Sequence, residues 1–201
     1  MKKIMGAVKK IGMFLGIVLV LLVILGAFFG GEPSYKIYEG KSNKSTIAKK
    51  TEQKPENLPL GTRVSSDNIE VTVFDAKISD KYIDCTAGIC MPYKPEKKDY
   101  VFLWVYLSAK NTGKDKEYPP KAGPVLWKGQ QFEKRYFGPS EDPYYNLSEY
   151  STIDPIYSNA EKKGYVLYEV PKEINLSEAV VVIDYSSVNP WSDFMPTFRL
   201  G

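Results

Sequence analysis

One uninterrupted apolar run near the start of this 201-residue chain limits what the chain can fold into. The run covers 11–31, IGMFLGIVLVLLVILGAFFGG, and its 21 residues include no charged or polar side chain. A helix of that length spans roughly 31 Å, about the thickness of the hydrocarbon core of a bilayer. The sequence therefore predicts one N-terminal transmembrane helix, an uncleaved signal anchor, over 11–31.

Charges on either side of the run predict its orientation. Residues 1–10 hold four lysines, and no acidic residue occurs before Glu32. An excess of lysine marks the cytoplasmic flank of a membrane span. We therefore expect a single-pass protein of the cell membrane, with residues 1–10 in the cytoplasm and the rest of the chain outside the cell.

Two other interpretations of the run stay open. A cleaved signal peptide usually has an apolar core of about 7–15 residues before a small-x-small site, whereas this core is longer and Phe interrupts each nearby candidate site. The residues Lys10-Ile11-Gly12 before Met13 resemble the loose motif of pilin-type archaeal leaders. The alternative is then a pilin-like surface subunit that is processed before Met13.

Charge and the missing histidine exclude several functions. The chain has a formal charge of +3, but residues 61–201 carry 17 basic and 20 acidic side chains. No basic stripe remains there to neutralise phosphates, so we expect no nucleic-acid partner. Because the chain has no histidine, Ser-His-Asp catalysis and His-ligated zinc are ruled out. We expect no cofactor, no metal and no catalysis.

The remainder of the chain divides into a linker and one β domain. Residues 32–60 are polar and rich in Lys, Glu, Ser and Pro, which is typical of a flexible linker. Residues 61–201 hold about seven short strands with Gly and Pro between them. This pattern predicts an all-β domain, an immunoglobulin-like β-sandwich.

Several strand patterns are specific. The apolar phase changes after Ile69, Val71 and Val73, which predicts a β-bulge. The segment 100–110, YVFLWVYLSAK, is apolar on both faces for most of its length and is therefore expected to be a central strand. Further strands are expected at 164–171, 179–185 and 197–200, and a short hairpin around Lys128-Gly129-Gln130.

Three of these segments carry a resemblance to a known family. They are the long strand that closes in Asn111-x-Gly113, the Trp127-x-Gly129 hairpin, and Gly164-x-Val166-x-Tyr168-x-Val170-Pro171 followed by the apolar strand 179–185. Over 61–201 the sequence resembles the telokin-like, immunoglobulin-type domain of unknown function found on extracellular lipoproteins and membrane-anchored proteins of bacteria and archaea. The resemblance implies a surface-exposed sandwich without an assigned active site. The chain lacks a lipobox cysteine, so the apolar helix would replace the lipid anchor.

The two cysteines form the first candidate site. Cys85 and Cys90 are separated by four residues that include Gly88. Outside the membrane an isolated pair favours a disulfide, and the short loop limits its stabilisation to about 2–3 kcal/mol. A redox motif would separate its cysteines by two residues.

The stretch 136–157 is rich in tyrosine, proline and acidic residues. Tyrosines offer large amphipathic contact area at low entropy cost, so a recognition surface for a protein or glycan is one interpretation. A loop that packs its rings on its own sandwich is the other. The candidate residues are Tyr136, Tyr144, Tyr145, Tyr150 and Tyr157.

Acidic residues and glycosylation motifs complete the candidates. Glu141, Asp142, Glu149 and Asp154 would be the carboxylates of a hydrolase of surface polymers, the enzymatic alternative. Asn43, Asn146 and Asn175 each begin an Asn-x-Ser sequon and are possible glycosylation sites. The sequence as a whole predicts a membrane-anchored extracellular module with a binding or structural role at the cell envelope.

Overall fold

The computed structural model describes residues 35–38, 56–86, 89–137 and 149–201. Within these ranges no helix is long and apolar enough to cross a bilayer. The expected span at 11–31, the cytoplasmic segment 1–10 and the processing site before Met13 all lie outside the described residues.

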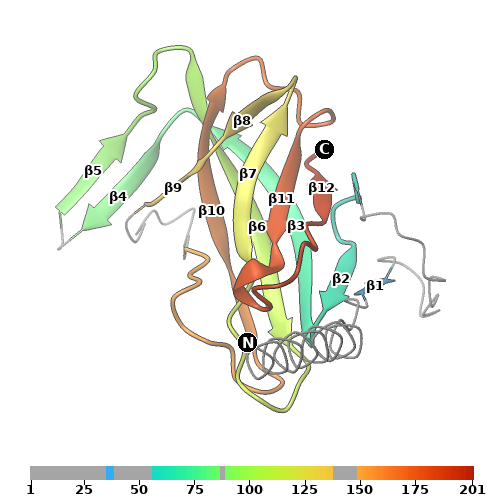
Figure 1. Cartoon of the computed structure of the whole chain (residues 1–201). Coiled ribbons are helices and arrows are strands. Elements are labelled where there is room, and N and C mark those ends of the chain that lie inside the picture. The colour runs from blue at the N-terminus through green and yellow to red at the C-terminus, as the bar shows by residue number, and fades with distance from the viewer. Residues whose placement is uncertain (1–34, 39–55, 87–88, 138–148) are drawn as a thin grey trace, which may run out of the picture. The chain divides into compact units, whose positions relative to one another are not determined.

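The described strands form three antiparallel sheets (Figure 1). The first has six strands in the order β1-β2-β3-β6-β10-β9, the second has four in the order β12-β11-β7-β8, and the third is the pair β4-β5. Their bounds are β1 (Tyr35–Tyr38), β2 (Arg63–Ser66), β3 (Ile69–Ser79), β4 (Tyr82–Thr86), β5 (Ile89–Tyr93), β6 (Tyr100–Asn111), β7 (Lys121–Trp127), β8 (Gln130–Phe132), β9 (Lys134–Arg135), β10 (Glu161–Pro171), β11 (Val180–Asp184) and β12 (Thr197–Arg199).

The hydrophobic core lies between the two larger sheets, which makes the domain a β-sandwich. Alternate residues of each strand point into it, as the period of two in a strand requires. Its buried members come from both sheets and include Val71, Leu103, Val105, Leu107, Val125, Val181, Ile183 and Phe198. Each such side chain contributes roughly 1.5–3 kcal/mol through its removal from water.

Strand β6 is central in the six-stranded sheet, as its two apolar faces predict. It pairs with β3 on one side and β10 on the other. The predicted bulge in β3 is also confirmed, because the register with β6 shifts between Val73 and Asp75. After the bulge Ala76 lies opposite Val105, while Phe74 is exposed and lies beside Tyr106.

The predicted hairpin at 128–130 joins β7 to β8. Lys128 and Gly129 form its turn with φ of 48° and 75°, the positive values that a two-residue hairpin turn uses. Gln130 pairs with Trp127 and is already part of β8.

Three buried tyrosines hold distant segments of the sandwich together through their hydroxyl groups. Tyr168 on β10 donates to the Gly123 carbonyl of β7 at 2.8 Å, and so joins the two sheets. The Tyr185 hydroxyl lies 3.2 Å from the Val64 carbonyl of β2. Tyr150 donates to the Pro120 carbonyl at 3.1 Å. Burial raises the pKa of each of these tyrosines above its ordinary value of 10.

The structure differs from the predicted boundaries in three places. The described residues hold more than the seven expected strands, because β1, β2, β4, β5 and β9 are short and leave only a weak sequence pattern. Strand β1 lies inside 32–60, and so does Leu58, whose backbone forms a bridge with Phe198, so folded residues begin before Gly61. Tyr185 belongs to a 3-10 turn, Tyr185–Ser187, that the Asp184 side chain caps.

Candidate recognition face

The outer face of the six-stranded sheet is aromatic, where the outward positions of a sandwich are usually polar. On β6 the side chains that alternate with the core residues are Tyr100, Phe102, Trp104 and Tyr106. Phe102 and Trp104 are nevertheless only 2% and 4% exposed. Other segments of the chain must therefore cover part of this face.

Two aromatic side chains cover it, Tyr82 of β4 and Phe137 after β9. The ring of Tyr82 lies 5.1 Å from Phe102 and 5.4 Å from Trp104, both edge-on, and Phe137 lies 5.0 Å from Trp104. Together with Leu167 these residues form a second, smaller apolar cluster. Edge-to-face pairs of this kind contribute about 0.5–1.5 kcal/mol beyond the area they bury.

Of the polar groups in this small cluster, the Trp104 indole forms a hydrogen bond and the Tyr82 hydroxyl has a shifted pKa. The Trp104 indole donates to the Ser79 hydroxyl at 2.8 Å. Burial, with the nearby Asp84 carboxylate, raises the pKa of Tyr82 to about 12. Tyr82 therefore stays neutral at physiological pH and acts as a packing residue.

The rest of the face is partly open to solvent, since Phe74 is exposed while Tyr106 and Tyr165 are half-buried. Tyr106 lies 4.8 Å from Tyr165 and 5.6 Å from Phe74, with the rings tilted by only 32° and 37°. These three rings form a stripe across β10, β6 and β3. A hollow with a cavity volume of about 30 Å³ lies beside Tyr165 and Trp104, so it accepts a single small group.

Strands β4 and β5 extend this surface beyond the sheet (Figure 1). Every residue of β5 is exposed, including the apolar Ile89, Met91 and Tyr93. The ring of Tyr93 stacks on Tyr82 at 5.5 Å, which joins the hairpin to the aromatic cluster. We call Phe74, Tyr106 and Tyr165 together with these three β5 residues the recognition face.

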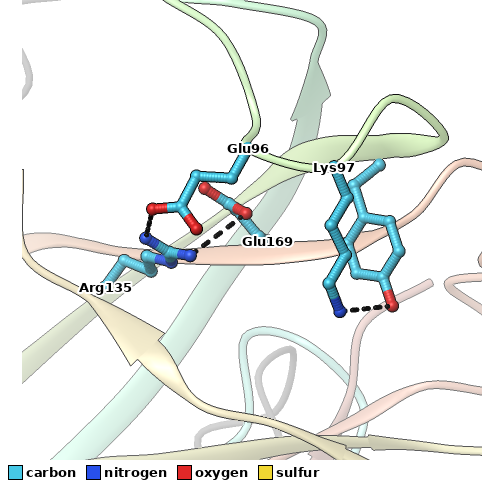
Figure 2. Close-up of polar contacts among 5 residues, drawn as sticks. Glu96, Lys97, Arg135 and Glu169 are labelled. Carbon is cyan, nitrogen blue, oxygen red and sulfur yellow. Dashed lines mark hydrogen bonds and ion pairs between the residues drawn. The ribbon is translucent and has the colours of Figure 1, made fainter.

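A polar recess lies beside the aromatic cluster, where the chain passes from β8 to β9. Figure 2 shows Arg135 between two carboxylates, with 2.7 Å to Glu96 and 3.4 Å to Glu169. Lys97 donates to the Tyr100 hydroxyl at 3.3 Å in the same view. The recess holds about 510 Å³ of open space.

The electrostatics of this recess indicate a structural role for Arg135. The hydrogen bond from Arg135 lowers the pKa of Glu96, and the same bond raises the pKa of Arg135. Because both ends of the guanidinium already hold a carboxylate, its charge is balanced within the protein. Arg135 thus joins the loop after β5 to β9 and β10, and so supports the hairpin of the recognition face.

The described members of the predicted tyrosine surface differ in exposure. Tyr136 and Tyr157 are exposed, but Tyr150 is 5% exposed and its hydroxyl is occupied by Pro120. Tyr150 is therefore a core residue. Its backbone can approach β10 closely because Gly164 has no side chain at that point. Tyr144 and Tyr145 lie outside the described residues.

The other predicted site residues are dispersed. Backbone register places Cys85 directly opposite Cys90 in the β4–β5 hairpin. Glu149 bridges to Tyr165 through its backbone, and the carbonyl of Asp154 accepts from Lys162. Asn175 is exposed, and its side-chain oxygen Oδ1 accepts hydrogen bonds from the backbone amide and the hydroxyl of Ser177. The remaining candidates, Asn43, Glu141, Asp142 and Asn146, lie outside the described residues.

Sequence reasoning missed the recognition face, although one signal was available. The outward positions of 100–110 are aromatic in sequence, and this indicated only a central strand. The alternation could not show that Tyr82 and Phe137 cover one half of the face and leave the other half open.

Comparison with known proteins supports the fold and no further assignment. No protein-family model matches the chain, and no curated protein sequence matches it. An uncharacterized β-sandwich protein from Clostridium difficile is similar over 76% of this chain and 99% of its own, with a TM-score of 0.50 and 16% identity. The yjhA protein from Bacillus subtilis is similar over 72% of this chain and 99% of its own, with a TM-score of 0.51 and 14% identity. The described domain is thus a β-sandwich of unknown function.

Proposed function

We propose that this protein is a non-catalytic binding module of the cell envelope, held in the membrane by residues 11–31, with its sandwich outside the cell. The proposal includes the finer assignment of the sandwich to the telokin-like, immunoglobulin-type class. The observation that carries the binding role is the recognition face, an aromatic stripe continued by the exposed side chains of β5. Large exposed apolar patches with polar surroundings mark interaction sites.

The composition of the recognition face favours a protein partner. Aromatic residues and Met are enriched at protein–protein interfaces, and Phe74, Met91 and Tyr93 are all exposed here. Each strand of the β4–β5 pair has a single neighbour in its sheet. A partner strand can therefore add to the pair through main-chain hydrogen bonds, while Ile89 and Met91 supply side-chain contacts.

A disulfide between Cys85 and Cys90 belongs to the same proposal. The opposed register of the two residues in the β4–β5 hairpin supports it. The bond would hold the hairpin in one conformation, which lowers the entropy cost of binding. Alkylation of the intact protein tests it: neither cysteine should react before reduction, and reaction of both in the unreduced protein would refute it.

Site-specific photocrosslinking tests the binding role. A benzoylphenylalanine at Met91, introduced into the chain in the cells that produce it, should form a discrete, protease-sensitive adduct. The matched control is the same group at Arg199, an exposed position on the four-stranded sheet away from β5, where no adduct is expected. An adduct that resists protease but is lost with a glycosidase would replace the protein partner by a glycan, and no adduct at Met91 would refute the proposal.

Protease added to intact cells tests the location. The proposed topology predicts digestion of the sandwich without lysis. Resistance until the cells are lysed would refute it. Sequencing of the mature N-terminus separates the anchor from the pilin-like alternative, which requires an N-terminus at Met13.

A further inference from the structure

Several loops meet at the end of the sandwich where the chain enters β1. The first residue of β1, Tyr35, pairs with Ser66, which directly precedes the turn between β2 and β3. Asn111 at the end of β6 lies opposite Ile69 just after that turn. The loops at this end are 67–68, 112–120, 151–160 and 185–196, and we call them the Trp191 end.

Hydrogen bonds join these loops into one surface. The Asn189 amide donates to the Asp67 carboxylate at 3.4 Å, and the Ser187 hydroxyl donates to the Pro119 carbonyl at 2.9 Å. Glu117 and Ile156 exchange two backbone hydrogen bonds of 3.1 and 2.7 Å. The loops therefore hold their side chains in fixed relative positions.

Large apolar side chains project from this surface. Trp191 is 93% exposed and Ile153 is 82% exposed, and Tyr157 and Tyr118 are exposed as well. The Asn189 side chain accepts from the Trp191 backbone amide at 3.1 Å, so the loop that carries the indole is held in place. The other two tryptophans of the chain, Trp104 and Trp127, are both buried.

Chain length connects this end to the apolar run. Gly31, the last residue of the run, precedes Tyr35 by four residues. A fully extended chain covers about 14 Å in four residues, while the headgroup layer on each side of the hydrocarbon core is roughly 5–8 Å thick. If 11–31 crosses the bilayer, the Trp191 end can be no farther from the membrane surface than these few residues allow.

From these observations we infer that the Trp191 end rests on the lipid bilayer, with the Trp191 indole at the level of the headgroups. The inference rests on the proposed membrane anchor. Trp and Tyr are the residues that prefer this interface, because their rings are apolar and their edges are polar. The sandwich is then oriented with this end toward the membrane.

The charges at this end indicate which type of lipid headgroup it can contact. Its loops carry the acidic residues Asp67, Asp115, Glu117, Asp154 and Asp193 against two lysines, Lys114 and Lys116. An excess of negative charge is not attracted to anionic lipids, so the contact fits a zwitterionic interface. The contact is intramolecular once the chain is anchored, and the resulting high effective concentration lets a weak interaction persist.

Fluorescence of Trp191 in vesicles tests the inference. The full chain is reconstituted into phosphatidylcholine vesicles with or without a nitroxide quencher at headgroup level. Subtraction of the Trp191→Phe spectrum isolates the Trp191 signal, because the other two indoles are buried in both proteins. We expect the quencher to reduce this signal by about half or more, since it would lie at the depth of the indole.

A matched control places a tryptophan elsewhere. Glu173→Trp in the Trp191→Phe background adds an exposed indole just after β10 ends, at the opposite end of the sandwich. The lipid quencher should leave its emission unchanged, whereas aqueous acrylamide should quench it strongly. Equal lipid quenching at both positions would overturn the inference.

Flotation of the same vesicles separates the inference from the anchor on which it rests. Flotation of the protein with lipid quenching of Trp191 supports both. Flotation without quenching keeps the anchor and overturns the inference. That result is expected if a protein, and not lipid, covers this end in the cell. Failure to float overturns both.

Discussion

Replacement of Tyr168 by phenylalanine should destabilise the protein at neutral pH and have almost no effect at pH 11. The Tyr168 hydroxyl donates to the Gly123 carbonyl at 2.8 Å. Gly123 lies where the register of β7 with β11 shifts between Val181 and Ile183, so the tyrosine supplies a partner at an irregular point of the sheet. Loss of such a buried hydrogen bond costs about 1–2 kcal/mol.

The pH dependence follows from the direction of the pKa shift. Burial, with Glu133 nearby, raises the pKa of Tyr168 above its ordinary value of 10. Above pH 10 the unfolded chain releases this proton while the folded protein keeps it, so the free energy of unfolding falls as pH rises. The loss at pH 11 is about 1.4 kcal/mol for one tyrosine. The phenylalanine variant does not incur this loss, so the two proteins should become nearly equal in stability.

Urea unfolding of both proteins at pH 8, 10 and 11 measures this difference, with the emission of the buried Trp104 and Trp127 as the signal. Tyr136→Phe is the matched control, because this tyrosine is exposed and its removal should change stability little at any pH. A Tyr168→Phe deficit that stays the same from pH 8 to pH 11 would refute the assignment of a buried, protonated hydroxyl. A deficit of zero at pH 8 would refute the hydrogen bond.

Three further substitutions test the packing around the loops and turns by urea unfolding or thermal melting. Gly164→Ala should cost about 2–3 kcal/mol, since the added Cβ would lie 2.5 Å from the Tyr150 nitrogen, and an unchanged midpoint would contradict this close approach. Asn111→Ala should cost about 3 kcal/mol, because the buried side chain makes three hydrogen bonds to the backbone, and a cost below about 1 kcal/mol would mean that water replaces them. Lys128→Gly should stabilise by about 0.5–1 kcal/mol, because it relieves a φ of 48°, and a lower melting temperature would argue against that turn.

Much of the sandwich was predictable from local patterns. The alternation in 100–110 identified β6, and the phase change after Val73 identified the bulge in β3. The β4–β5 hairpin was not expected, since its apolar residues lie on an exposed strand and leave no core pattern. Strand β1 was included in the predicted linker, because an edge strand needs only main-chain pairing and its four residues are too few for a clear period.

The candidate surfaces show the same division. The sequence showed that 136–157 is rich in tyrosine, but only the structure showed that Tyr150 is buried while Tyr136 is exposed. The sequence contains Trp191, but it gives no indication that the loops at 118, 153 and 157 lie at the same end of the sandwich. Side-chain exposure at such positions depends on contacts between segments distant in the chain.

By itself the sequence determined the expected membrane segment, the placement of charge on either side of it, and the inward phase of the long strands. Each of these depends on residues that are neighbours in the chain, where period, length and charge act directly. The tertiary structure decided which aromatic rings of the outer face are covered, which hydroxyls join the two sheets, and which loops gather at the Trp191 end. These depend on strand order and register, which bring together residues as far apart as Tyr185 and Val64.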